Sequence, residues 1–312
     1  MSVTAKRLGD ELPFEVKFSH PDAGIVRDAG GTALRIPLPW LAGDKSECIF
    51  PRSFAAGESG GFTLLSAGQL LLGCAVQRID GSLHDVTRDL YSRLLAASAG
   101  RSLYRIWNYV PAINATVAGL ENYHAFCAGR SEAFETAYGR EFKRTLPAAS
   151  AVGSGGETLA VAFAAGPATA RHIENSEQIP AYEYPPEHGF RPPCFSRATL
   201  ATNLGRPLIF ISGTAAIKGH VTIAPGSLRE QLDCTLDNLR IVGRAAGVGE
   251  SLGADTGFER HFKVYLRHAS DLATAQERLS RDLIRPGDRV NYLHADICRA
   301  ALNIEIEATL VA

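Results

Sequence analysis

The sequence of 312 residues has no closely spaced pair of cysteines, and none of its nine histidines forms an HxxxH or HExxH pattern. Zinc sites and dithiol redox centres usually place two ligands within a few residues of each other, so these absences count against both. A glycine run at 153–157 (GSGGE) lacks the Lys-Ser/Thr of a phosphate-binding loop. We therefore expect no metal ion, and we expect the six cysteines to be free thiols packed as small apolar groups.

An excess of charge of one sign is also missing. The chain has 32 Lys and Arg against 33 Asp and Glu, a formal net charge of −1. Nucleic-acid binding needs a net basic face, so no nucleic-acid partner is expected. No apolar run approaches the ~20 residues that span a bilayer, and residues 1–16 lack the apolar core of a signal peptide. We expect a cytoplasmic protein with no membrane partner.

What the sequence does contain is a repeated layout. Residues 62–73 (FTLLSAGQLLLG) align with residues 208–219 (LIFISGTAAIKG), and both begin as apolar, strand-like runs that meet small residues. The same offset places 84–100 opposite 230–247, where leucines recur at the spacing of an amphipathic helix. The repeat predicts an internal duplication.

Further elements follow each of these helices. A strand-like segment comes next in both copies, at 102–111 in the first and at 260–268 in the second. The second copy then continues with a helical segment, 271–284, and with two strand-like runs within 292–312. Alternating strands and helices of this kind predict an α+β fold. Pro, Gly, Ala and Ser accumulate in 145–180, so we divide the chain into an N-terminal domain, 1–150, and a C-terminal domain, 151–312.

The second half resembles the Rid/YjgF family of small trimeric proteins. The resemblance rests on the order ISGTA, RAAG, FKVYLRHASDLATAQE and ICRAALNIEIEA within 207–312. It implies two Rid/YjgF-like units in one chain, each a helical bundle on a sheet of the chorismate mutase-like type, with the first unit degenerate. Two units in one chain would take the place of a contact between subunits of the small trimers. A monomer is compatible with this arrangement.

Four further motifs resemble the chorismatases, enzymes that remove pyruvate from chorismate. They are RIWNYVPAIN, GLENYHAFCAGRSEAFE, AYEYPPEHGFRPPCFSRA and ISGTA, spread over about 100–312, whereas the first 40 residues match no known pattern. The resemblance implies chorismate as a small-molecule substrate, no cofactor, and a role in secondary metabolism.

Removing pyruvate from an enol ether requires an acid that is protonated near neutral pH. Burial on an apolar strand raises the pKa of a carboxyl group in this way. The resemblance places the catalytic glutamate at Glu305, in LNIEIEA. Glu307 shares its face of the strand. Taken alone, the pattern favours two solvated glutamates on an outer face, and only the resemblance favours Glu305 as the acid.

Chorismate also carries two carboxylates, which arginine and tyrosine side chains can bind. The chorismatase motif assigns a substrate carboxylate to Arg130, with Tyr123 in the same wall. Tyr184 is the family's substrate-binding phenol, although Tyr182 has the same parity. Arg197 is a second carboxylate-binding candidate, or else part of a structural salt bridge.

Two small residues bear on the product. Gly213 and Cys298 match the branch of the family that forms 3-hydroxybenzoate, where they would leave room for the ring and keep water out. Their ordinary alternatives are a tight turn and a core filler. Simple hydrolysis to a dihydroxycyclohexadiene carboxylate and formation of 4-hydroxybenzoate stay open as other outcomes.

Two further classes of function compete with this interpretation. Rid-type imine deaminases carry a carboxylate-binding arginine about where this chain has Val290 and Asn291, with Arg289 one residue away and on the opposite face of a strand. That departure counts against a deaminase. A non-catalytic ligand-binding protein would require Glu305, Arg130 and Tyr184 to lie apart rather than in one pocket.

Overall fold

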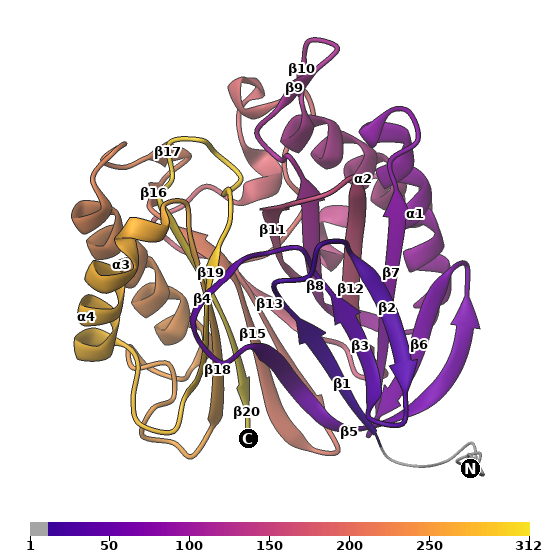
Figure 1. Ribbon diagram of the computed structural model, residues 1–312, viewed down its shortest axis with the longest axis horizontal. Coiled ribbons are helices and arrows are strands. Elements are labelled where there is room, and N and C mark those ends of the chain that lie inside the picture. The colour runs from indigo at the N-terminus through magenta and orange to yellow at the C-terminus, as the bar shows by residue number, and fades with distance from the viewer. Residues whose placement is uncertain (1–11) are drawn as a thin grey trace.

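The computed structural model describes residues 12–312, and the prediction about a signal peptide rests mainly on residues outside this range. Two large sheets face each other at the centre of the molecule, with a pair of helices on the outer side of each (Figure 1). Among the described residues, no helix is long and apolar enough to cross a membrane.

The first sheet orders its nine described strands as β11-β8-β12-β7-β6-β5-β1-β3-β2. In chain order they are β1 (Leu12–Lys17), β2 (Gly24–Asp28), β3 (Gly31–Arg35), β5 (Ser46–Ser59), β6 (Phe62–Ala67), β7 (Leu70–Arg78), β8 (Ser102–Pro111), β11 (Ala148–Ser154) and β12 (Thr158–Gly166). Its helices are α1 (Leu83–Ala97) and α2 (Asn122–Tyr138). Residues 12–35, part of the segment that resembled nothing in the sequence analysis, thus supply strands that extend this sheet.

The second sheet orders its strands as β13-β14-β15-β20-β18-β19-β4. They are β4 (Trp40–Gly43), β13 (Arg171–Ile173), β14 (Ala198–Asn203), β15 (Arg206–Ala215), β18 (Glu259–Leu266), β19 (Arg289–His294) and β20 (Ile304–Val311). Helices α3 (Leu228–Ala246) and α4 (Leu272–Asp282) cover it. Two short hairpins, β9 (Thr116–Val117) with β10 (Leu120–Glu121) and β16 (Ile217–Lys218) with β17 (Val221–Thr222), lie outside both sheets.

Strand order confirms the predicted duplication. The run β11-β8-β12-β7-β6 in the first sheet matches β19-β18-β20-β15-β14 in the second. The first pair of each run is parallel and the remaining pairs are antiparallel. The α+β class with two similar units, each a sheet covered by two helices, is therefore correct.

The predicted alignment of the two copies is wrong by one strand. Position in the sheets makes β6 the counterpart of β14, so residues 62–73 do not correspond to 208–219, whereas α1 and α3 do occupy equivalent places. The two strands of a hairpin are equally apolar here, so composition alone could not distinguish them. The predicted domain division at residue 150 falls inside β11, and the first sheet continues to Gly166 because β12 lies between β7 and β8.

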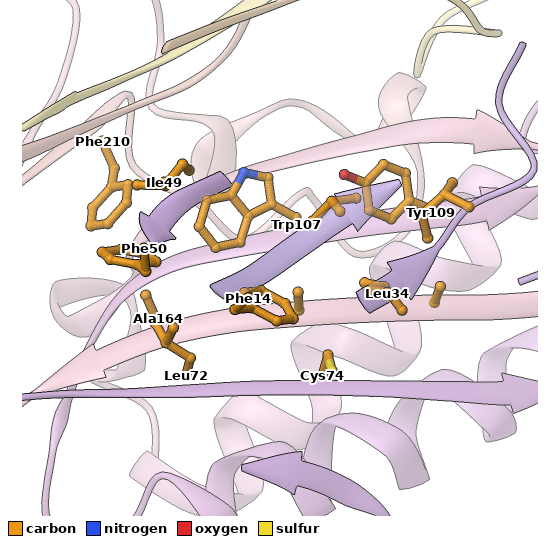
Figure 2. Close-up of a cluster of buried hydrophobic side chains, with 14 of the residues drawn as sticks. Phe14, Leu34, Ile49, Phe50, Leu72, Cys74, Trp107, Tyr109, Ala164 and Phe210 are labelled. Carbon is orange, nitrogen blue, oxygen red and sulfur yellow. The ribbon is translucent and has the colours of Figure 1, made fainter. Parts of the chain in front are cut away.

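The core between the two sheets is built from large aromatic side chains of the first sheet. Trp107 and Tyr109 of β8 lie beside Phe14 and Phe50, and Phe210 of the second sheet lies near them (Figure 2). The rings of Trp107 and Phe210 are 5.9 Å apart and nearly perpendicular, a favourable edge-to-face geometry. This contact is one of those that join the two units.

Strand β20 has both faces buried, which explains its alternating sequence. Ile304 and Ile306 pack against the helices of the second unit, while Glu305 and Glu307 point the other way, toward the first sheet. Both glutamates are buried, so the alternative of two solvated side chains on an outer face is wrong.

Candidate active site

A cavity of about 400 Å³ lies where the two units meet. Helix α2 and strand β11 form one side, and β15, β20 and the segments around residues 178–197 and 298–301 form the other. All seven residues selected from the sequence line it: Tyr123, Arg130, Tyr184, Arg197, Gly213, Cys298 and Glu305. The requirement that Glu305, Arg130 and Tyr184 converge on one pocket is met.

Glu305 is the buried acidic residue among those that line this cavity. Its side chain is 4% exposed. Burial, with the nearby negative charge of Glu307, raises the pKa of Glu305 to about 8, and Arg105 opposes the shift only in part. A carboxyl group with such a pKa is mostly protonated at neutral pH, as general acid catalysis requires.

Glu307, two residues further along the same strand, has the opposite protonation state. Its carboxylate accepts hydrogen bonds from Arg105 Nη2 (2.7 Å) and Trp107 Nε1 (3.0 Å), and it pairs with Lys263 Nζ (2.7 Å). Although burial works against ionisation, Lys263 and Arg105 lower the pKa of Glu307. Glu307 is therefore a structural anion that raises the pKa of Glu305, and the two carboxyl groups differ in role because their partners differ.

Gly213 lies in a strand and not in a turn. The pairing of β15 with β20 shifts register between Ile211 and Thr214, which marks a bulge. A Cβ atom at residue 213 would overlap the Oε1 atom of Glu305 and come within 2.6 Å of its Cδ. Glycine is needed here so that the carboxyl group can lie against the backbone of β15.

Arg130 lies inside α2, at the helix face that points toward the core. The segment 121–130 is thus the start of a buried helix, with Glu121 as its N-cap residue. The Arg130 guanidinium stacks over the rings of Tyr91 (5.3 Å) and Phe134 (5.8 Å). Within residues 12–312 its Nε and Nη2 atoms have no hydrogen-bond partner. Two buried donors on one side of a fixed guanidinium match the two oxygens of a carboxylate.

Tyr184 and Arg197 form a second polar group in the cavity. Arg197 Nη2 donates to the Tyr184 hydroxyl (2.9 Å) and to the carbonyl of Ile179 (3.0 Å). Arg197 Nε has no hydrogen-bond partner among the described residues and lies 3.8 Å from Glu174. Tyr182 packs into the core of the first unit and does not line the cavity. Of the two tyrosines that the sequence left open, Tyr184 is the one placed to contact a ligand.

Cys298 and Tyr123 supply a neutral wall. Burial raises the pKa of the Cys298 thiol to about 12, with a further contribution from Glu305, and burial raises the pKa of Tyr123 well above its usual value. Cys298 is therefore a thiol and not a reactive thiolate at neutral pH. Its contribution is shape and low polarity.

Arg299 is a lining residue that the sequence analysis missed. Its Nη1 donates to the carbonyl of His220 (2.7 Å) and its guanidinium lies 5.2 Å from the ring centroid of Tyr184. Nη2 is buried and has no partner within the described chain. Arg299 lies within the segment ICRAALNIEIEA, directly after Cys298, so the sequence did offer a signal that could have been used.

Val290, the position that would hold the deaminase arginine, packs against the core of the second unit and does not line the cavity, and neither does the next residue, Asn291. The Asn291 side chain donates to the backbone carbonyls of Asp44 (2.7 Å) and Ser46 (3.2 Å), where β19 pairs with β4. The carboxylate-binding groups of this chain are on α2 and on the connections around β13 and β20 instead.

A buried acid facing several partly unpaired guanidinium groups defines a site for acid catalysis on a small molecule that carries carboxylates. Comparison with known proteins agrees. The family model described as Chorismatase FkbO/Hyg5-like, N-terminal, matches residues 49–165, which end at the last strand of the first sheet.

Relatives extend the match over nearly all of the chain. A 3-hydroxybenzoate synthase of Streptomyces hygroscopicus is 35% identical over 268 residues, covering 82% of this chain and 78% of that protein. A chorismatase of the same species is 37% identical over 303 residues, covering 92% and 85%. A chorismatase crystal structure superposes with a TM-score of 0.82 at 30% identity, covering 99% of this chain and 96% of the other. The chain belongs to the chorismatase family of enzymes.

Proposed function

We propose that this chain converts chorismate into pyruvate and 3-hydroxybenzoate, with Glu305 as the proton donor. The observation that carries the proposal is the buried carboxyl of Glu305, whose pKa burial raises to about 8, in a cavity lined by arginines. The name of one relative, 3-hydroxybenzoate synthase, supports the choice of product.

Arg130, Arg197 and Arg299 bind the two carboxylates of the substrate. Each of the three has at least one buried guanidinium nitrogen without a hydrogen-bond partner in the described chain, and that nitrogen of Arg197 lies 3.8 Å from Glu174. A buried donor that lacks a partner costs roughly 1–3 kcal/mol, and a substrate carboxylate removes that cost. Three cations around one cavity also attract a dianion before it binds.

The first chemical step moves a proton from the Glu305 carboxyl to the terminal methylene of the enolpyruvyl group. The methylene becomes a methyl group, and positive charge develops at the ether carbon next to it. Glu305 becomes a carboxylate, which stabilises the cation at close range. Burial raises the pKa of the Cys298 thiol to about 12, so this residue adds no thiolate nucleophile to the cavity.

The hydroxyl group of the ring then captures the cation. Two bonds then break: the bond between the ether oxygen and the three-carbon unit, and the bond between the ring and the captured oxygen. The captured oxygen leaves as the carbonyl oxygen of pyruvate. The ether oxygen stays on the ring as the 3-hydroxyl and takes up the proton that the ring hydroxyl lost on capture. Glu305 carboxylate takes up the ring proton whose loss makes the ring aromatic, which restores the acid. The sequence consumes no water, since chorismate and the two products have the same atoms.

Exclusion of water decides between this outcome and simple hydrolysis. The cavity lining includes Ala215, Ala149 and Ile217, whose side chains offer no hydrogen bond to a water molecule, together with the hydroxyl-bearing Ser150 beside Gly213. A ring held against small apolar groups can turn its own hydroxyl toward the cation.

The test is to incubate the purified chain with chorismate, measure pyruvate with a coupled dehydrogenase, and identify the organic acid by chromatography against standards. Pyruvate with an equal amount of 3-hydroxybenzoate is the expected result. A dihydroxycyclohexadiene carboxylate would keep the substrate and reject the ring-capture step. Absence of pyruvate from folded protein would reject the proposal.

A further inference from the structure

Three side chains outside the acid centre converge on a single point, and two of them, Glu187 and His188, line the cavity. His188 Nε2 lies 3.0 Å from His220 Nδ1, and the Oε1 atom of Glu187 lies 3.5 Å from the first and 3.2 Å from the second. Glu187 and His188 end the short 3-10 helix Pro186–His188, whereas His220 is in the turn between β16 and β17. Two segments that are distant in sequence thus present their ligand atoms to one another.

We propose that Glu187, His188 and His220 bind a divalent transition-metal ion, of which zinc is the best match. Zinc bonds to histidine nitrogen and carboxylate oxygen are about 2.0–2.1 Å, so two ligand atoms on a tetrahedral zinc ion lie about 3.3 Å apart. The three separations in this cluster bracket that value. Two imidazoles and one carboxylate favour zinc and its neighbours over magnesium or calcium, which prefer oxygen ligands.

Hydrogen bonding alone leaves this cluster incompletely satisfied. Only one proton can lie between His188 Nε2 and His220 Nδ1, so one ring donates and the other accepts. The Glu187 oxygen faces the same two nitrogens and can share that proton only weakly. A cation at the centre accepts a lone pair from all three atoms at once, and it leaves a fourth position for a water molecule.

An ion at this place would contact segments that hold two residues of the cavity lining, Tyr184 and Arg299. The His188 ring is 5.4 Å from the ring of Tyr184, and the His220 carbonyl accepts the hydrogen bond from Arg299 Nη1. An ion held by both histidines joins the 186–188 segment to the β16–β17 hairpin and fixes these two lining residues in place. The site shares no ligand with Glu305 or Arg130, so it does not depend on the proposed reaction.

The sequence analysis expected no metal because no two histidines are close along the chain. His188 and His220 are separated by the connection that contains β14 and β15. The hairpin turn at Gly219, which adopts a positive φ of 55°, brings His220 back over the 3-10 helix. Spacing rules apply to ligands on one helix or one loop and do not detect a pair of this kind.

The experiment is titration of tag-free, chelator-treated protein with zinc chloride in a calorimeter, followed by cobalt chloride with visible spectroscopy. Wild-type protein should bind one equivalent of zinc, and bound cobalt should give the absorption bands of a tetrahedral site. His220→Gln should weaken zinc binding by about tenfold or more. His268→Gln changes an exposed histidine outside the cluster and serves as the control that should bind like the wild type.

Glu187→Gln provides a second variant whose folding is not in question, because the Glu187 side chain is 63% exposed. It should also weaken zinc binding, and the zinc-induced rise in the melting temperature should be smaller than in the wild type. Absence of zinc binding by the wild type would overturn the proposal. Equal binding by the wild type, His220→Gln and Glu187→Gln would overturn it too, because the ion would then lie elsewhere.

Discussion

The carboxyl group of Glu305 occupies the space that any side chain at residue 213 would need. A Cβ atom there would overlap Oε1 of Glu305 and would lie 3.2 Å from the Cβ atom of Ser150. Because strand β11 closes the other side, the carboxyl group cannot move away without entering the cavity. The position of the Glu305 carboxyl group therefore requires a glycine at residue 213.

Gly213→Ala should displace the Glu305 carboxyl group and lower kcat/KM for pyruvate release by about 100-fold, since a displacement of about 1 Å at a reacting group has effects of this size. The share of hydrolysis product should rise at the same time. Initial rates and product chromatography measure both. Gly24→Ala is the matched control, because a Cβ at residue 24 would meet no atom within 4 Å; full activity of Gly213→Ala with unchanged product would contradict the account.

The activity should fall as pH rises through the pKa of the acid. Burial raises the pKa of Glu305 to about 8, and only the protonated form can donate, so kcat/KM should be level at neutral pH. Above about 8 it should decline tenfold for each further pH unit. The measurement is the pH profile of pyruvate release, with circular dichroism as a check that the protein stays folded. A profile that rises between pH 7 and pH 9 would show that Glu305 acts as a base or not at all.

Arg130→Lys should raise KM about tenfold or more while kcat changes much less. Lysine keeps the positive charge but loses the planar fork that binds both oxygens of a carboxylate. The steady-state constants for chorismate separate the two effects. Arg191→Lys is the comparison variant, because Arg191 pairs with Glu135 outside the cavity. An unchanged KM in Arg130→Lys would remove Arg130 from the binding site.

Glu307→Gln should destabilise the fold, whereas Glu305→Gln should not. Glu307 neutralises the buried Lys263 and Arg105, and removing one partner of a buried ion pair costs about 3–5 kcal/mol. Glu305 is already mostly neutral, so the amide replaces a group of similar polarity. Urea unfolding at neutral pH compares the two variants with the wild type. Equal stability of Glu307→Gln and wild type would show that the ion pairs of Glu307 with Arg105 and Lys263 do not stabilise the fold.

Local periodicity predicted much of the fold. Strands 102–111 and 260–268 and the helix in 271–284 are present with nearly the expected bounds, since each pattern reflects which side of an element is buried. The alternation of apolar and polar residues in β20 was equally visible, but the sequence did not show that its polar face is buried. A polar face on a strand usually contacts solvent. Here it faces the first sheet, where Arg105 lies on β8, and Lys263 lies on the adjacent strand β18.

The candidate site was predictable where residues act within one motif, and not where segments from both units meet. Family resemblance selected Arg130, Tyr184 and Glu305, and the structure brings all three to one cavity. His220 carried no local signal because its neighbours come from distant parts of the chain, whereas Arg299 stands directly after Cys298 and could have been selected. The opposite protonation states of Glu305 and Glu307 also depend on tertiary contacts, which no spacing in the sequence encodes.

The most direct test of the central claim is pyruvate release from chorismate by wild type and Glu305→Gln, measured side by side at neutral pH with equal unfolding midpoints as a control. We predict steady release of pyruvate and 3-hydroxybenzoate by the wild type and a rate lower by about 100-fold or more in the variant, because a positioned acid contributes about 10²–10⁴-fold. A folded Glu305→Gln protein that releases pyruvate at the wild-type rate would contradict the assignment of Glu305 as the acid.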